Sequence, residues 1–361
     1  MRTGVVNLPL HGGKCPQWLF PRMKLLGGVI SEIIIDEHGQ NEYLRRLSDP
    51  YFFQAFGCVL GFDWHSSGLT TTVCGALKEA LNSSNLGVQV AGGKGKTSLK
   101  TMQELENAEL STKTVEKLKY ASRISAKVDS ALVQDGYKLY HHSFIYSDDG
   151  SWAVVQQGLS DETQYARRYH WLSDNIKSFV EEPHSAICCD FREQKVLDMT
   201  SQESLDSQRI SLDLVKDNPK HLRRFTSQSA LTDFYCPSAK FTMRAGHAIV
   251  KMDERNLQSL QRAYEFQPES YEELVSLRGI GAKTIRSLAL ISELVYGAKP
   301  SWKDPVKYSF AHGGKDGIPY PVDRQVIDCS TGILHDAIQN ARIGDRERID
   351  AIRRLNHYLK Y

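Results

Sequence analysis

The residues most suited to chemistry lie together between positions 279 and 286 of this 361-residue chain. They are Gly279, Ile280, Gly281, Ala282, Lys283 and Arg286. The two glycines can take positive φ, which would leave the backbone amides of residues 280–282 uncovered. Amides at the start of a helix lie at the positive end of its dipole and bind phosphate oxygens, and the two cations add charge beside them. Phosphate binding is therefore the chemistry that this stretch predicts.

Two short helices must position these groups. Ser270 and Glu273 have the spacing of a capping box, which predicts that a helix begins after Ser270. The glycines end that helix, and an apolar face resumes from Ala282 to Gly297, a residue type that often follows the last helical turn. The sequence thus predicts a helix-hairpin-helix that holds the backbone of double-stranded DNA without reading its bases. Such binding should weaken as salt is added.

Lys94 and Lys96 form a second candidate contact with DNA. They lie in the glycine-rich stretch 92–98, which lacks the glycine that a Walker A motif needs at position 90, where the chain has valine. We therefore expect a mobile basic loop that touches a phosphate backbone. A solvated charged surface is the alternative.

Four further residues could line an additional site. His11 and Lys14 lie in a Gly- and Pro-rich N-terminal segment, and Asp63 and His65 lie in the stretch 61–68. A carboxylate beside an imidazole can tune its pKa for acid–base chemistry. The alternatives are a plain turn near the N-terminus and, at 61–68, a serine that caps a buried helix.

Residues 164–180 combine cations with aromatic rings, and we expect a helix here. Arg167, Arg168, Tyr169, His170 and Trp171 follow one another directly. This composition suits the stacking of an extruded base or the lining of a channel for a single strand. Packing of Trp171 in the core is the alternative.

The composition is that of a globular protein, with 41% hydrophobic residues for the cores of two or three domains. No apolar run is long enough for a membrane span and no signal peptide is evident, so we expect no membrane contact and a cytoplasmic location. The seven cysteines include no CxxC pair, which argues against a disulfide framework and a zinc ribbon. We expect no cofactor and no metal, and the oligomeric state is left open.

The predicted fold class is α+β, predominantly α-helical, with a small antiparallel β-hairpin or sheet and a C-terminal helix-hairpin-helix. Residues 137–157 alternate in hydrophobicity around Asp149 and Gly150, a strong hairpin-turn signal. We expect an N-terminal helical region with a basic loop (1–130), a central region with the β-hairpin and helices (131–267) and a C-terminal hairpin region (268–361). The net charge is only +2, but residues 278–361 hold 14 Lys and Arg against nine Asp and Glu, so basic charge gathers beside the predicted hairpin.

The stretch 277–284, LRGIGAKT, resembles the helix-hairpin-helix of endonuclease III-like DNA glycosylases. In the bifunctional members of that superfamily, the lysine at the position of Lys283 is the Schiff-base nucleophile. An aspartate follows in a Val-Asp-x-x-Val context, which Asp323 matches. The resemblance therefore implies that Lys283 and Asp323 are catalytic. This chain differs by an insertion at about 298–320, by Arg278 where proline is common and by the lack of a cysteine cluster for an iron–sulfur centre.

The chain as a whole resembles a family of archaeal and bacterial proteins, domain of unknown function 763. The resemblance rests on the segments TGVVNLPLHGGK, FFQAFGCVLGFDWHSSGLTTTV, GGKGK, YHHSFIY, WAVVQQG and YSFAHGGKDGIPYPVDR. It implies abasic-site (AP) lyase activity in DNA repair, with or without base excision, on an architecture unlike that of standard glycosylases. A non-catalytic helix-hairpin-helix DNA-binding protein is the alternative, and a metal-dependent nuclease is a third hypothesis.

Overall fold

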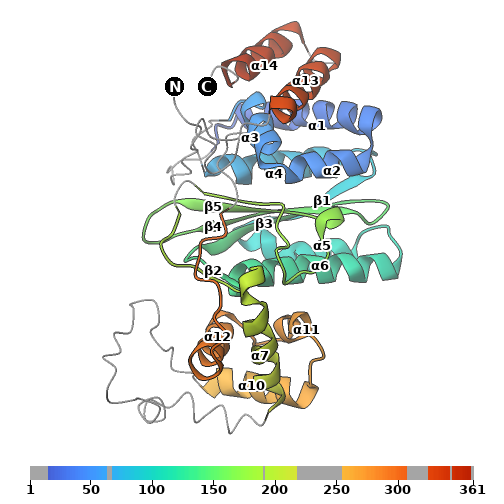
Figure 1. Ribbon diagram of the computed structural model, residues 1–361. Helices are drawn as coiled ribbons and strands as arrows, with labels where there is room; N and C mark the ends of the chain where they lie inside the picture. The colour runs from blue at the N-terminus through green and yellow to red at the C-terminus, as the bar shows by residue number, and fades with distance from the viewer. Residues whose placement is uncertain are drawn as a thin grey trace.

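The computed structural model describes residues 15–62, 67–189, 192–217, 254–306, 324–341 and 344–358. Within these ranges the chain is a mixed α+β protein, in which helices lie on both sides of a five-stranded antiparallel sheet (Figure 1). The predicted class is confirmed at this level. No helix of the described ranges is long and apolar enough to cross a membrane.

Four helices cover the upper face of the sheet in Figure 1. They are α1 (Leu19–His38), α2 (Gln40–Ser48), α3 (Pro50–Val59) and α4 (Gly68–Leu81). α3 begins where the Asp49 carboxylate accepts a hydrogen bond from the Tyr51 amide at 2.8 Å, with Pro50 at the first helical position. The hydroxyls of Ser31 and Tyr43, 2.7 Å apart, join α1 to α2.

The sheet has the strand order β1-β3-β4-β5-β6, and every neighbouring pair is antiparallel. The strands are β1 (Val88–Lys94), β3 (Lys138–Ser147), β4 (Trp152–Leu159), β5 (Ala166–Leu172) and β6 (Ala186–Cys188). A separate two-stranded sheet pairs β2 (Val133–Gln134) with β7 (Leu197–Asp198). The predicted hairpin is β3–β4, and Gly150 in its turn has a φ of 87°, which glycine adopts without strain.

The prediction of a helix at 164–180 is wrong, because this stretch forms β5 and the turns that follow it. β5 is buried along its whole length on both faces. A strand buried on both faces lacks the alternation of polar and apolar residues that identifies a half-exposed strand. The paired arginines therefore resembled a solvated helix although both are fully buried.

The remaining helices lie below the sheet or above the N-terminal helices (Figure 1). Below it are η1 (Gly95–Lys100), α5 (Thr101–Glu106), α6 (Thr112–Ala131), α7 (Leu205–Lys216), α10 (Glu254–Phe266), α11 (Tyr271–Ser276) and α12 (Ala282–Tyr296). The last two, α13 (Arg324–Asn340) and α14 (Asp345–Tyr358), pack on α1 and α3 at the other end. The short turns η2 (Ser173–Asn175) and η3 (Gln202–Ser204) complete the description.

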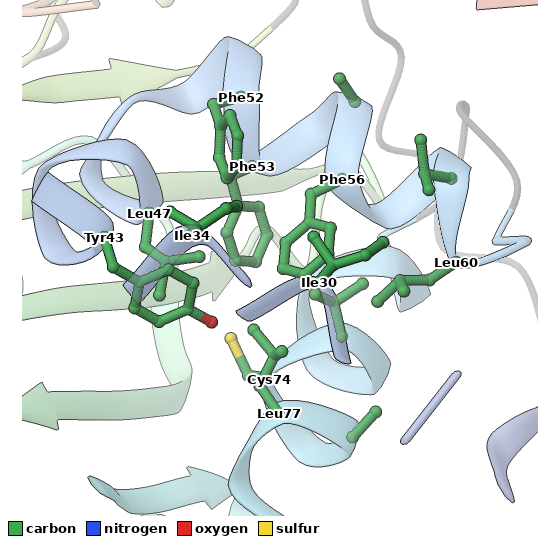
Figure 2. Packing of buried hydrophobic residues seen from close by; sticks show 14 of the residues in the cluster. Ile30, Ile34, Tyr43, Leu47, Phe52, Phe53, Phe56, Leu60, Cys74 and Leu77 are labelled. Carbon is green, nitrogen blue, oxygen red and sulfur yellow. The ribbon is translucent and has the colours of Figure 1, made fainter. Parts of the chain in front are cut away.

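One sheet separates two hydrophobic cores. The upper core joins the four N-terminal helices, α13 and α14 to side chains such as Ile145 and Val155 on the upper face of the sheet. Figure 2 shows its centre, where rings and branched side chains of α1 to α4 interdigitate. The lower core joins α6, α7 and α10 to α12 to Phe144, Val154 and Trp171 on the opposite face. Each core therefore uses residues from all three predicted regions of the chain.

Candidate nucleic-acid interface

The two helices predicted around the glycines are α11 and α12. The Ser270 hydroxyl accepts a hydrogen bond from the Glu273 amide at 3.1 Å, and the Glu273 carboxylate accepts one from the Glu269 amide at 2.8 Å. These bonds cap the start of α11, as the sequence predicts. α12 ends at Tyr296 and is capped by Gly297, whose φ of 74° is left-handed and whose amide donates to the Glu293 carbonyl. The likeness of this helix pair to a DNA-binding hairpin stays a prediction.

The two glycines of the turn have different surroundings. Gly279 has a φ of 93°, and a Cβ at this position would lie 2.3 Å from Ser259 Oγ of α10. Gly279 thus allows α10 to approach the turn closely. Gly281 has extended backbone, and a Cβ there would meet nothing within 4 Å. Of the two, it is Gly281 that borders open space.

Two amides at the start of α12 face this open space. The amide of Ile280 was expected to be uncovered, but it donates to the Leu277 carbonyl at 3.3 Å, and the Ile280 side chain is buried. Among the described residues, no acceptor bonds the amides of Ala282 and Lys283. The Lys283 side chain is exposed beside them. The predicted phosphate site therefore narrows to the backbone of 281–283 and the Lys283 ammonium group.

Arg286 lies against the segment that follows α12. Its guanidinium carbon is 5.5 Å from the centre of the Trp302 ring, a cation–π distance. Partial burial lowers the pKa of Arg286 from its usual value. The Trp302 indole donates in turn to the Glu293 carboxylate at 3.2 Å. The contact predicted between Arg286 and phosphate stays a prediction.

Two residues outside the predicted site fix the turn to the rest of the molecule. Lys127 of α6 donates to the Leu277 carbonyl at 3.2 Å, and Gln134 of β2 donates to the Ala282 carbonyl at 2.8 Å. Burial lowers the pKa of Lys127. These partners lie about 150 residues apart in the sequence, and no local pattern could have linked them. The carbonyl side of the turn is thus anchored, while its amide side stays open.

Lys94 and Lys96 are exposed in regular structure, where a mobile loop was expected. Lys94 is the last residue of β1, and Lys96 lies in η1. The bend before them needs glycine: Gly92 has a φ of 85°, and a Cβ there would lie 2.3 Å from a carbonyl oxygen of β3. The Gly92 amide donates to the Glu104 carboxylate at 2.7 Å. Lys94 Nζ lies 6.0 Å from the centre of the Tyr140 ring.

Lys94 is also the first of four polar residues that form one row across the sheet. It pairs with His141, His141 pairs with Gln157, and Gln157 pairs with Arg168. We call these four residues the polar row. Lys94 is exposed, whereas the other three are almost completely buried. A cluster of buried polar side chains calls for an explanation, because burying a polar group is costly unless the group is hydrogen-bonded.

The polar row lies on the upper face, beneath the start of α4. The Gln157 side-chain amide donates to the Ser67 carbonyl at 2.9 Å and also bonds the Tyr140 hydroxyl. Arg168 donates to the Thr70 hydroxyl at 3.3 Å. These contacts join the sheet to the residues that directly follow the stretch 63–66.

A second polar network lies on the lower face at the same end of the sheet. The Asp129 carboxylate accepts hydrogen bonds from Gln156 at 2.6 Å and from the Trp171 indole at 3.1 Å, and it is paired with His184. Gln156 Oε1 lies 2.9 Å from His142 Nδ1. Trp171 is therefore a core residue, which was the alternative to a base-stacking role.

Arg167 is buried in an ion network of its own. It pairs with Asp135 at 3.0 Å and with Asp304 at 2.7 Å, and the Tyr169 hydroxyl donates to Asp135 at 2.6 Å. Burial alone would lower the pKa of Arg167, but the nearby carboxylates raise it well above its usual value. Arg167, Tyr169 and Trp171 thus hold the lower face of the sheet together and do not line a strand channel.

A cavity of about 200 Å³ lies beside β7. Its lining includes His184, Asp198, Thr200, Glu203 and Lys303, and none of the described residues predicted to form a site. The carboxylates outnumber the single lysine, so the cavity repels phosphate and does not extend the candidate interface. In the described part of the chain, no group of three or more His, Cys, Asp or Glu could hold a metal ion.

Five residues predicted from the sequence lie outside the described ranges. They are His11, Lys14, Asp63, His65 and Asp323. Their predicted roles stay predictions. Of the other predicted site residues, the structure places Gly281, Ala282 and Lys283 together at the start of α12, and it places Lys94 and Lys96 at the end of β1.

The comparison with models of protein families gives a match. A family model described as "Protein of unknown function (DUF763)" matches residues 4–322. The chain belongs to this family. The family resemblance predicted from the sequence segments is thus confirmed. No curated protein and no solved structure matches the chain.

The polar row of this DUF763 protein was missed because its members were considered one segment at a time. The signal was present in the β-hairpin, where two consecutive buried polar residues lie near the start of β3 (His141 and His142) and near the end of β4 (Gln156 and Gln157). Alternation predicts which residues share a face of a strand. It does not predict which strands are neighbours, so β1 and β5 could not be added to the row.

Proposed function

We propose that this DUF763 protein is a DNA-repair enzyme that binds damaged double-stranded DNA and cleaves abasic sites as a lyase. The observation that supports the proposal is the open N-terminus of α12, where two amides without a described partner adjoin the exposed Lys283. The start of a 15-residue helix attracts a phosphate group through its amides and its dipole. In this proposal the helix pair acts as a helix-hairpin-helix that contacts the DNA backbone.

In the proposed reaction, a lysine amine attacks C1′ of the ring-opened abasic sugar. Loss of water leaves an iminium ion, and a proton then leaves C2′. The freed electron pair forms a double bond between C2′ and C3′ as the 3′ phosphate departs, and water later hydrolyses the imine. The attacking amine must be unprotonated, which burial or neighbouring cations favour. Lys283 is the first candidate for the amine, and Asp323 is the candidate that orients the sugar or moves the proton.

Borohydride reduction tests the proposed chemistry, because it converts the imine into a stable bond between protein and DNA. The wild-type protein, mixed with abasic duplex in the presence of EDTA, is expected to form this adduct and to cleave the strand. Lys283→Ala then shows whether Lys283 is the amine, and Lys299→Ala is the control, since Lys299 is an exposed lysine beyond the other end of α12. An adduct that persists in Lys283→Ala excludes Lys283 as the amine, and Lys14, Lys94 and Lys96 are then the next candidates. Absence of both adduct and cleavage with the wild type would refute the lyase.

The second candidate function is a non-catalytic DNA-binding protein. The open amides beside the exposed Lys283 favour it, because contacts with phosphate alone position DNA without any chemistry. This function predicts that the wild type binds intact and abasic duplex equally well and that Lys283→Ala weakens both. A measurable preference for abasic DNA, or any EDTA-resistant cleavage, would contradict it.

A further inference from the structure

Four stretches that are far apart in the sequence bring polar residues to one end of the sheet. β1 supplies Lys94, the start of β3 supplies Tyr140 and His141, the end of β4 supplies Gln157 and β5 supplies Arg168. At the other end of the same upper face, the strands carry mainly apolar residues of the upper core, with Ser147 as a buried polar exception. Apolar side chains are enough to pack the other end of this face. Packing alone therefore does not explain why the residues at this end are polar.

Several buried polar side-chain atoms of the described residues have no hydrogen-bond partner, and two of them lie on neighbouring strands of this row. These two are His141 Nδ1 and Gln157 Oε1, on residues that are 1% and 0% exposed. The other imidazole nitrogen of His141 bonds Ser143 Oγ at 3.1 Å, and the other polar atom of the Gln157 amide bonds Ser67 and Tyr140. Buried polar atoms in folded proteins nearly always have a partner. Two unpaired atoms on neighbouring strands of one row indicate that a ligand completes the site.

The row reaches solvent at Lys94. Lys94 is exposed and Tyr140 is half-buried beside it, at an irregularity in the pairing of β3 with β4 between Leu139 and His141. Such irregularities redirect a side chain and often border functional sites. A ligand that bonds the two unpaired atoms would therefore pass Lys94 and Tyr140 on its way inward.

The charges along the row define the ligand. Lys96, just beyond the outer end of the row, is an exposed cation that attracts an anion, and Lys94 pairs directly with His141. Further in, burial lowers the pKa of His141 to about 3, so its imidazole is neutral, and the Gln157 amide is neutral as well. Arg168, the last member of the row, is a buried cation that donates to Thr70. A molecule with phosphate beside Lys96 and with carbonyl or hydroxyl groups beside Lys94, His141 and Gln157 matches this order. A sugar phosphate has this chemistry.

We propose that this end of the sheet binds the ring-opened sugar of an abasic nucleotide, and that Lys94 Nζ is the amine that attacks it. The inference rests on the proposed lyase function and locates its chemistry at the polar row. Lys283 at the start of α12 then holds a phosphate elsewhere along the same duplex. The two sites lie on different sides of the sheet, since the polar row is on the upper face and α12 belongs to the lower core.

The bonds made and broken are those of an imine-forming elimination. The Lys94 lone pair forms the N–C1′ bond with the aldehyde, and the aldehyde oxygen leaves as water. A C2′ proton passes to solvent, its bonding electrons form the C2′–C3′ double bond, and the C3′–O bond breaks to release the 3′ phosphate. Water then hydrolyses the imine and restores the lysine. No oxidant or reductant takes part.

Mass spectrometry of the reduced adduct tests the location of the amine directly. The full chain is incubated with abasic duplex and borohydride, the product is digested with protease and nuclease, and the modified lysine is identified. We expect the modification on Lys94. Modification of Lys283 or of another lysine would overturn this inference and leave the lyase function intact, whereas absence of any adduct and any cleavage would overturn both.

Variants separate an amine from a cation that binds phosphate. Lys94→Arg keeps the charge, so we expect its affinity for intact duplex to change by less than about twofold while the adduct is lost. Lys283→Ala should weaken duplex binding and still form the adduct at saturating protein. Lys100→Arg is the matched control, because Lys100 is an exposed lysine of the same segment and should leave adduct formation unchanged. Full adduct formation by Lys94→Arg would contradict the assignment.

Discussion

Three histidines are held neutral inside the sheet. Burial lowers the pKa of His141, His142 and His170, and for His141 the value falls to about 3. An imidazole in an unfolded chain has a pKa of about 6.5. In acid the unfolded chain therefore binds protons that the folded protein cannot accept. The same burial that keeps His141 neutral for a ligand thus makes the fold sensitive to acid.

This sensitivity predicts the pH dependence of stability. Above about pH 6.5 the three histidines are neutral in both states, so their contribution is constant. As the pH falls from about 6.5 toward the folded pKa, each one lowers the free energy of unfolding by up to about 1.4 kcal/mol per pH unit. Urea unfolding of wild type and His141→Gln across this window measures the effect. The variant should have the shallower slope, and equal slopes would show that His141 does not titrate on unfolding.

At the scale of the elements, the turn between α11 and α12 depends on two glycines with different structural roles. Gly279 combines positive φ with close packing against α10, whereas Gly281 is extended and open. The sequence shows two similar glycines one residue apart. Their roles could not be distinguished without the position of α10, which approaches the turn through Ser259.

Alanine at each glycine provides a matched pair. Gly279→Ala should lower the free energy of unfolding by about 1–3 kcal/mol, because alanine is strained at this φ and its Cβ would collide with Ser259 Oγ. Gly281→Ala should cost at most about 1 kcal/mol, the usual difference between glycine and alanine before the first turn of a helix. Chemical denaturation of the two variants checks this order. A larger loss for Gly281→Ala would mean that the open side of the turn carries an unrecognised contact.

Helices and strands were predictable to different extents for a physical reason. The bounds of α12 and of the β3–β4 hairpin follow from local patterns, since the helix has an apolar face and a terminal glycine and the hairpin has a clear turn. β5 was taken for a helix because Arg167 and Arg168 are buried and form their hydrogen bonds with partners 32 to 137 residues away in the sequence. The exposed lysines of the candidate site could likewise be found from the sequence, while the buried row depends on strand order.

At the scale of the whole molecule, both ends of the described chain share one core. α13 and α14 place Leu334, Ile338 and Leu355 against the N-terminal helices, and Arg354 donates to the Val59 carbonyl at 2.9 Å. The N-terminal helices therefore cannot bury their apolar faces fully without the last two. Stability of the upper core should depend on residues near the C-terminus.

Leu355 tests this dependence. Leu355→Ala removes a side chain that is 1% exposed, and we expect a loss of about 2–5 kcal/mol in the free energy of unfolding. Ile349→Ala on the same helix is the control, because Ile349 is 48% exposed and should change stability by less than about 0.5 kcal/mol. Urea titration of both variants makes the comparison. Similar small losses for the two would indicate that α14 contributes little to the upper core.

Gln156 and Gln157 are consecutive residues of β4 that bond on opposite faces of the sheet. Gln157 bonds Ser67 and Tyr140 above, and Gln156 bonds Asp129 below. A single peptide unit thus belongs to both polar networks. If β4 slid along its own axis, the hydrogen bonds of Gln157 above the sheet and of Gln156 below it would lengthen together. β4 therefore couples the two layers mechanically. A molecule seated on one side of the sheet would therefore stiffen the other side without touching it.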